Sequence, residues 1–329
     1  MRTVKGLSIL LLLFTLSAMI AAQMKVDVRL VNVVATVTDE RGRYVGGLTA
    51  DDFTLEEDGI VQKIAHFSQD TDIPVSVGIV LDTSGSMDRK IRTAVDSVDR
   101  FLRRIHPDDE IFLMTFSSQP ALRQEFTSDR EKLSEALGKI RPVGGTSLYD
   151  ALSQSLQVIR KGRHDKRAIL LISDGQDTSS VRTLDHVLQL IRESELLVYS
   201  LGITPLTYGD RTEHVPFTWP LPLPGTPTRR GVPVTSRRDE VDMRVLQDFG
   251  ENSGGRSFLL AESFAGGRGA EIEKVLTQIA DELRSQYTLG YYPTHPDDGR
   301  YHTIRVSTKG GHLVRARRGY LAGSSNPPR

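Results

Sequence analysis

The 329-residue sequence contains no cysteine. This absence excludes disulfide bonds, thiolate metal sites, cysteine nucleophiles and lipid attachment through cysteine. Charge of either sign is not in excess, because 42 basic residues balance 42 acidic ones and the formal net charge is zero. No basic stripe typical of nucleic-acid-binding proteins occurs. The composition therefore predicts an ordinary globular protein without a nucleic-acid partner.

Long apolar runs are also missing, apart from one near the N-terminus. Residues 1–23 combine basic Arg2 and Lys5 with an apolar stretch at 6–20 and the small pair Ala21-Ala22. This pattern predicts a cleaved signal peptide, because the stretch is short for a membrane span of about 20 residues. An uncleaved anchor is the alternative. In both cases we expect the rest of the chain to lie outside the cytoplasm, in a secreted or periplasmic bacterial protein. If the signal is cleaved, we expect no integral membrane span.

Hydrophobic periodicity predicts an α/β region over residues 71–285. Buried strands are expected at 75–81, 111–116, 168–172, 196–202 and 257–260, and helices at 88–105, 129–140, 147–160, 181–193, 243–252 and 270–284. Alternation of strands and helices favours a mainly parallel sheet with helices on both faces. The predicted fold class is therefore α/β, with a Rossmann-like, doubly wound sheet.

The segments on either side of this region read as all-β. Residues 24–70 and 286–322 each contain only a few strand patterns, too few for an independent core. We therefore predict that they pair to form one small β-sandwich, with the α/β domain inserted between them.

Two further segments break these patterns. Residues 204–240 hold seven of the 15 prolines and the single tryptophan, Trp219, which predicts an exposed Pro-rich insertion. This insertion is either merely solvated or offers its Pro-Leu-Pro-Leu-Pro run to a partner. Residues 323–329 are expected to form a disordered tail.

Polar side chains cluster where predicted strands end or helices begin. Asp82-Thr83-Ser84-Gly85-Ser86 follows the strand at 75–81, Gly144-Gly145-Thr146-Ser147 precedes a helix, and Ser173-Asp174-Gly175 follows the strand at 168–172. Taken singly, each is explained by a helix cap or a turn. Together they point to one ligand site, because ligands bind beyond the carboxyl ends of strands in open α/β sheets. Oxygen-only donors suit a hard cation such as Mg²⁺.

These segments resemble the metal-ion-dependent adhesion site of the von Willebrand factor type A (VWA) family. The five positions of that site are matched without departure by Asp82, Ser84, Ser86, Thr146 and Asp174. The resemblance covers about residues 74–285. It implies that the two serines and, in the open state, the threonine bind the cation directly, whereas the aspartates act largely through water.

The flanking segments resemble a bacterial subgroup of VWA proteins described mainly from Acidobacteria. The matching runs are Asp51-Asp52-Phe53 with Glu57-Asp58-Gly59, and Tyr287-Thr288-Leu289-Gly290-Tyr291-Tyr292 through Arg318-Gly319-Tyr320. This part of the resemblance brings no established activity with it.

The VWA resemblance implies a metal-dependent protein-binding or adhesion module. We expect a divalent cation, Mg²⁺ first and Mn²⁺ or Ca²⁺ as alternatives, and a protein partner that offers an Asp or Glu to complete the coordination. The positive end of the helix expected to open at Met87 disfavours a cation, and the two carboxylates offset this effect. The sequence does not indicate an oligomeric state.

An enzyme is not expected. The sequence has no His-Glu-x-x-His motif, no Gly-x-Ser-x-Gly motif and no phosphate-binding loop. A Mg²⁺-dependent hydrolase is a remaining alternative, but the sequence indicates no residue that could act as the general base for the attacking water. The other alternative is an envelope structural or assembly factor in which the metal only stabilises the fold.

Overall fold

The chain is described by a computed structural model over residues 30–70, 73–204, 241–260, 268–295 and 297–323. The predicted signal peptide, the Pro-rich insertion beyond Thr204 and the tail from residue 324 lie outside the described residues. Within the described ranges, every helix is too short or too polar to cross a lipid bilayer.

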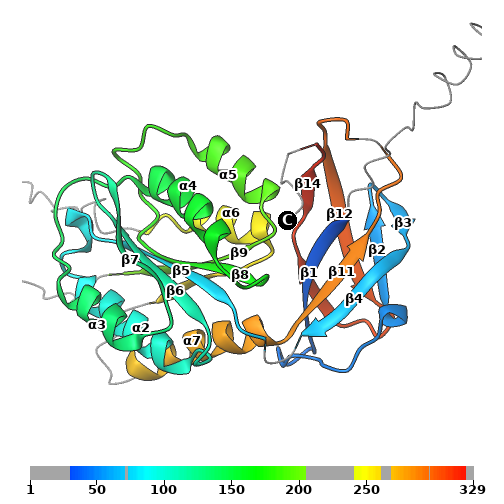
Figure 1. The fold of residues 1–329 in the computed structure, drawn as a ribbon, viewed down its shortest axis with the longest axis horizontal. Coiled ribbons are helices and arrows are strands. Elements are labelled where there is room, and N and C mark those ends of the chain that lie inside the picture. Colours follow the sequence, from blue (N-terminus) through cyan, green and yellow to red (C-terminus); the bar gives the residue numbers. More distant parts are fainter. Residues whose placement is uncertain (1–29, 71–72, 205–240, 261–267, 296, 324–329) are drawn as a thin grey trace, which may run out of the picture.

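A six-stranded sheet forms the centre of the α/β domain, with strand order β10-β9-β8-β5-β6-β7 (Figure 1). Its strands are β5 (Ser76–Asp82), β6 (Glu110–Phe116), β7 (Pro120–Thr127), β8 (Arg167–Ile172), β9 (Leu197–Ile203) and β10 (Ser257–Leu260). All neighbouring pairs are parallel except β6 and β7, which are antiparallel. The prediction of a mainly parallel sheet is confirmed.

Helices cover both faces of this sheet. They are α2 (Ile91–Arg104), α3 (Arg130–Gly138), α4 (Leu148–Val158), α5 (Leu184–Glu193), α6 (Met243–Ser253) and α7 (Arg268–Arg284). Three of them, α2, α3 and α7, pack on one face, and α4, α5 and α6 pack on the other. Strand β5 contributes Ile79 and Leu81 to the first core and Val80 to the second. Burial on both faces explains why the strand sequences are almost continuously apolar.

The remaining strands form two four-stranded sheets, in the orders β13-β1-β11-β4 and β14-β12-β2-β3. The strands are β1 (Val31–Thr38), β2 (Phe53–Glu57), β3 (Ile60–Gln62), β4 (Ile64–Asp70), β11 (Gln286–Tyr291), β12 (Tyr301–Thr308), β13 (Leu313–Ala316) and β14 (Gly319–Leu321). Each sheet combines strands from both ends of the chain, and residues such as Val33, Leu55 and Tyr287 share one core. The predicted fold class, a doubly wound domain inserted in a split β-sandwich, is confirmed.

The inserted domain leaves and re-enters the sandwich at neighbouring strands. Strands β4 and β11 pair antiparallel, with Asp70 opposite Gln286. The chain leaves after β4, and α7 ends only two residues before β11 begins. The two crossings therefore lie side by side.

A buried carboxylate, Glu282 of α7, joins the two parts of the molecule. It is fully buried and accepts a hydrogen bond from Tyr199 of β9 at 2.7 Å. From the sandwich side, Arg315 of β13 forms an ion pair with it, and Tyr44 lies 3.4 Å from it. Burial and the carboxylate raise the pKa of Tyr199 well above its ordinary value. Since an unpaired buried charge is costly, these partners favour one arrangement of the two parts.

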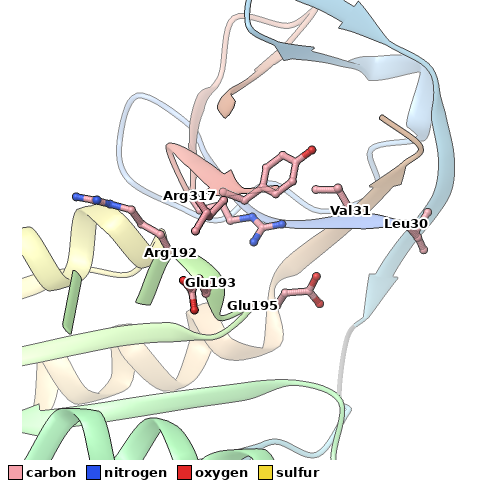
Figure 2. Close-up of a pocket in the computed structure, with 8 residues that line it drawn as sticks. Leu30, Val31, Arg192, Glu193, Glu195 and Arg317 are labelled. Carbon is pink, nitrogen blue, oxygen red and sulfur yellow. The ribbon is translucent and has the colours of Figure 1, made fainter. Parts of the chain in front are cut away.

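A small pocket lies at the same junction, between the end of α5 and the sandwich. Figure 2 shows Arg317 reaching between Val31 of β1 and the carboxylate of Glu195. The guanidinium of Arg317 donates a hydrogen bond to the backbone carbonyl of Asn32 at 2.5 Å. This pocket is lined by residues of both parts and belongs to their contact.

Two features differ from the sequence-based expectation. Strand β7 was not predicted, because its alternation is weak and its residues lie at a half-exposed sheet edge. The helix expected at 88–105 begins as a 3₁₀ turn, Gly85–Met87, and α2 starts only at Ile91. Apolar periodicity does not separate a 3₁₀ turn from an α-helical first turn, because both place Met87 on the buried side.

Candidate metal centre

All three predicted segments lie at the carboxyl edge of the central sheet. Asp82 is the last residue of β5, and Asp174 follows β8 by two residues. These strands are parallel neighbours, with Leu81 opposite Ile172, so their carboxyl ends meet. The side chains of both aspartates are fully buried.

Hydrogen bonds connect the first segment to the third. Ser84 N–H donates to Asp82 Oδ1 at 2.9 Å, and Ser173 Oγ–H donates to Asp82 Oδ2 at 2.8 Å. The hydroxyl oxygens of Ser84 and Ser86 are 2.9 Å apart. The two serines therefore present a pair of oxygen donors beside a buried carboxylate.

The threonine segment is hydrogen-bonded to the first segment and to residues that follow the third. Gly85 N–H donates to the carbonyl of Gly144 at 3.0 Å, which fixes the loop ahead of Thr146. The carbonyl of Thr146 accepts from Thr178 N–H at 2.8 Å and from Ser179 N–H at 2.9 Å. The structure thus brings all five predicted residues to one edge, and their role as metal ligands stays a prediction.

A lysine that the sequence analysis missed occupies this site. Lys90 is fully buried, and its Nζ lies 3.0 Å from Asp174 Oδ2. The prediction that the positive end of the following helix faces the site is therefore incomplete, because a full ammonium charge lies there as well. The sequence does contain a signal that Lys90 faces inward. Lys90 precedes the buried Ala94 and Val98 of α2 by four and eight residues, a spacing that places residues on the same face of a helix.

Burial and a neighbouring charge change the acidity of Asp82. Burial, and secondly the neighbouring carboxylate of Asp174, raise the pKa of Asp82 to about 6. Hydrogen bonds from Ser84 and Ser173 oppose this rise. Since a cation favours the ionised form of a nearby carboxylate, binding of a divalent ion is expected to lower the pKa again.

This pKa shift predicts a pH dependence of stability in chelator. The folded protein holds the Asp82 proton to a higher pH than the unfolded chain, so protonation stabilises the fold below about pH 4. That contribution is lost as the pH rises through about 6. Relative to Asp82→Asn, the free energy of unfolding of the parent should fall by about 2–3 kcal/mol between pH 4 and pH 7.

Urea unfolding in EDTA across this pH range measures the effect. The difference between the parent and Asp82→Asn is the quantity to follow, because exposed carboxylates with lowered pKa values, such as Asp58 and Asp129, contribute the opposite slope to both proteins. Parallel curves for the two proteins would contradict the prediction.

The donor set fits a hard divalent cation. Hydroxyl oxygens of Ser84, Ser86 and Thr146 and the carboxylates of Asp82 and Asp174 are all oxygen donors, the type that Mg²⁺ and Ca²⁺ prefer. Thr146 and Ser84 are buried at 4% and 1% exposure, whereas Ser86 is partly exposed. The fully buried carboxylates are thus shielded from solvent, and Ser86 lies on the outer side of the site.

Comparison with known proteins identifies the family of the α/β domain. Residues 77–176 match the family model of the von Willebrand factor type A domain. The chain is 28% identical to inter-alpha-trypsin inhibitor heavy chain H4 of Bos taurus over 130 residues. The alignment covers 35% of this chain and 14% of that protein. Over 146 residues it is 30% identical to calcium-activated chloride channel regulator 1 of Equus caballus, with coverage of 42% and 15%.

A solved structure with a similar fold is proximal thread matrix protein 1 from the mussel byssus, with a zinc-occupied MIDAS motif. It is 13% identical, with a TM-score of 0.47, and the match covers 74% of this chain and 50% of that one. The chain spans between 14% and 43% of the length of the curated relatives it matches.

The chain therefore carries a match to the von Willebrand factor type A domain over residues 77–176, and the α/β domain that contains these residues is inserted in a β-sandwich. The proposed relation of its flanks to an Acidobacterial subgroup stays a prediction.

Proposed function

We propose that this protein is an exported adhesion or assembly module that captures an acidic side chain of a protein partner through a divalent cation, Mg²⁺ first. The residues that would hold the ion are Asp82, Ser84, Ser86, Thr146 and Asp174. The observation that carries the proposal is the meeting of two buried carboxylates and a pair of serine hydroxyls at one sheet edge.

The charge balance of the site supports capture of an anion. Lys90 neutralises the carboxylate of Asp174. A divalent ion at the site would therefore face less negative charge than the two aspartates alone would provide. Neutral hydroxyl donors leave an ion attractive to a further carboxylate, which replaces one of the waters that Mg²⁺ usually retains. Such an arrangement stabilises a complex with Asp or Glu and has no need of bond cleavage.

A peptide library displayed on phage tests the proposal. In millimolar Mg²⁺, the full chain should select peptides that contain Asp or Glu, and their binding should be lost in EDTA. Replacing the essential acid by its amide should abolish binding. The double variant Ser84→Ala/Ser86→Ala should select no such peptides, whereas Ser134→Ala, at an exposed position in α3, should behave like the parent.

Peptides without an acidic residue, or binding that persists in EDTA, would contradict capture through a cation. The alternative, a structural metal in an envelope assembly factor, predicts that Ser84→Ala/Ser86→Ala loses its fold together with any binding. Circular dichroism of the double variant separates these two functions. The hydrolase alternative gains no support from the geometry. It needs a base to activate water, and the lysine of the site, Lys90, is engaged in an ion pair with Asp174.

A further inference from the structure

We propose that the β-sandwich contains a second metal site, for Zn²⁺ or a similar transition metal, built from Glu57, His295 and His302. One ligand atom of each residue lies within 4.8 Å of the other two. Glu57 ends β2, His302 belongs to β12, and His295 lies in the connection between β11 and β12. The cluster thus belongs to the sandwich strands β2 and β12 of Figure 1, whereas the VWA site belongs to the α/β domain.

The ligand atoms are held in a largely buried cluster. Glu57 and His302 are 3% and 7% exposed, and His295 Nε2 lies 3.1 Å from Glu57 Oε1. The hydroxyls of Tyr291 and Tyr320 donate hydrogen bonds to the same Glu57 oxygen at 2.9 and 2.7 Å. These contacts hold Glu57 Oε1 beside His295 Nε2.

The two imidazole rings lie against each other. Their centroids are 3.6 Å apart and their planes differ by 7°. Because an imidazole binds an ion in the plane of its ring, at least one of the two rings would turn when both bind the same ion. Two imidazole nitrogens with one carboxylate oxygen form the His₂Glu donor set, which suits Zn²⁺, whereas Mg²⁺ and Ca²⁺ favour oxygen donors alone. The site therefore differs in chemistry from the oxygen-only VWA site.

The surroundings of His302 resemble those of a metal-binding histidine. Its Nδ1 lies 2.8 Å from Asp58 Oδ2, and Asp58 Oδ1 accepts hydrogen bonds from Thr303 N–H at 2.8 Å and from the Thr303 hydroxyl at 2.9 Å. Ligating histidines usually donate their second ring N–H to a carboxylate in this way. Asp298 Oδ1, 3.1 Å from His302 Nε2, is the nearest candidate for a fourth ligand.

A metal at this point would link the two ends of the chain. Glu57 and His295 are 238 positions apart in the sequence, and the whole VWA domain lies between them. The chain has no cysteine, so a metal bridge would take the place that a disulfide holds in other exported proteins. Because metal binding requires the folded cluster, its binding free energy adds to the stability of the sandwich.

Zinc titration of the full chain tests this proposal. The titration is followed by calorimetry in excess Mg²⁺, which saturates the oxygen-only site, and zinc retained after desalting is counted by elemental analysis. We expect one Zn²⁺ per chain in the parent and in Asp82→Ala. Asp58→Asn should weaken zinc binding by about 10- to 100-fold, and His295→Gln should weaken it further. His186→Gln, at an exposed position in α5, should match the parent.

The thermal melt provides a second readout. In EDTA, His295→Gln should melt close to the parent, because His295 lies on a connection and is 22% exposed. Zinc should raise the midpoint of the parent and not that of His295→Gln. Absence of zinc binding by the parent, or equal binding by His295→Gln and the parent, would overturn the site. Zinc binding that is lost in Asp82→Ala and kept in His295→Gln would assign the metal to the VWA site and also overturn it.

Discussion

Replacing Lys90 with methionine is expected to lower the free energy of unfolding by about 3–5 kcal/mol in chelator. The ammonium of Lys90 and the carboxylate of Asp174 are both fully buried and lie 3.0 Å apart. Methionine fills a similar volume but leaves the carboxylate of Asp174 without a compensating charge, next to the second buried carboxylate of Asp82. Urea unfolding in EDTA measures the loss.

Two variants control for this effect. Lys132→Met removes an exposed lysine that pairs with Asp129 at 3.5 Å, and it should cost at most about 1 kcal/mol. The double variant Lys90→Met/Asp174→Asn removes both buried charges and should recover much of the loss. A Lys90→Met protein within about 1 kcal/mol of the parent in EDTA would contradict the buried ion pair as a stabilising element.

A divalent cation is expected to raise the melting temperature of the parent and to leave that of Asp82→Ala unchanged. A cation at about 1,000 times its dissociation constant adds about 4 kcal/mol to the folded state. Asp82 is fully buried and accepts hydrogen bonds from Ser84 and Ser173, so alanine removes both a carboxylate and the group that orients the serine. The measurement is a thermal melt in EDTA and in millimolar Mg²⁺.

Asp96→Ala, which removes an exposed carboxylate of α2, is the matched control and should respond to Mg²⁺ like the parent. Lys90→Met should gain more from Mg²⁺ than the parent does, because the divalent ion replaces the missing positive charge beside Asp174. An equal response of the parent and Asp82→Ala to Mg²⁺ would place the cation elsewhere in the molecule.

The α/β fold and the placement of the site were accessible from the sequence because both follow from local patterns. Runs such as 75–81 are apolar on both faces, and the segment that follows each strand must lie at the carboxyl edge of a parallel sheet. This reasoning brought Asp82 and Asp174 to one place without a structure. Pairing of the flanking segments followed from their insufficient strand number.

Contacts between distant residues were not accessible in this way. The position of Lys90 four residues before the buried Ala94 indicates a buried side chain, but its ion pair depends on how closely the start of α2 approaches the end of β8. Glu57, His295 and His302 lie in separate strands and turns, and only the pairing of β2 with β12 brings them together. Glu282 appears in the sequence as one of several acidic residues of α7, and nothing local indicates that Tyr199 and Arg315 meet it.

The side-by-side crossings at β4 and β11 determine how the protein carries mechanical load. The first and last described strands, β1 and β14, both belong to the sandwich. We therefore expect tension applied across β1 and β14 to be carried first by the hydrogen-bonded sandwich strands and only then by the VWA domain. If the proposed partner binds at the VWA site, a pull on it would reach the sandwich through two covalent connections that lie side by side where Asp70 and Gln286 are paired. We therefore expect the two connections to share such a force.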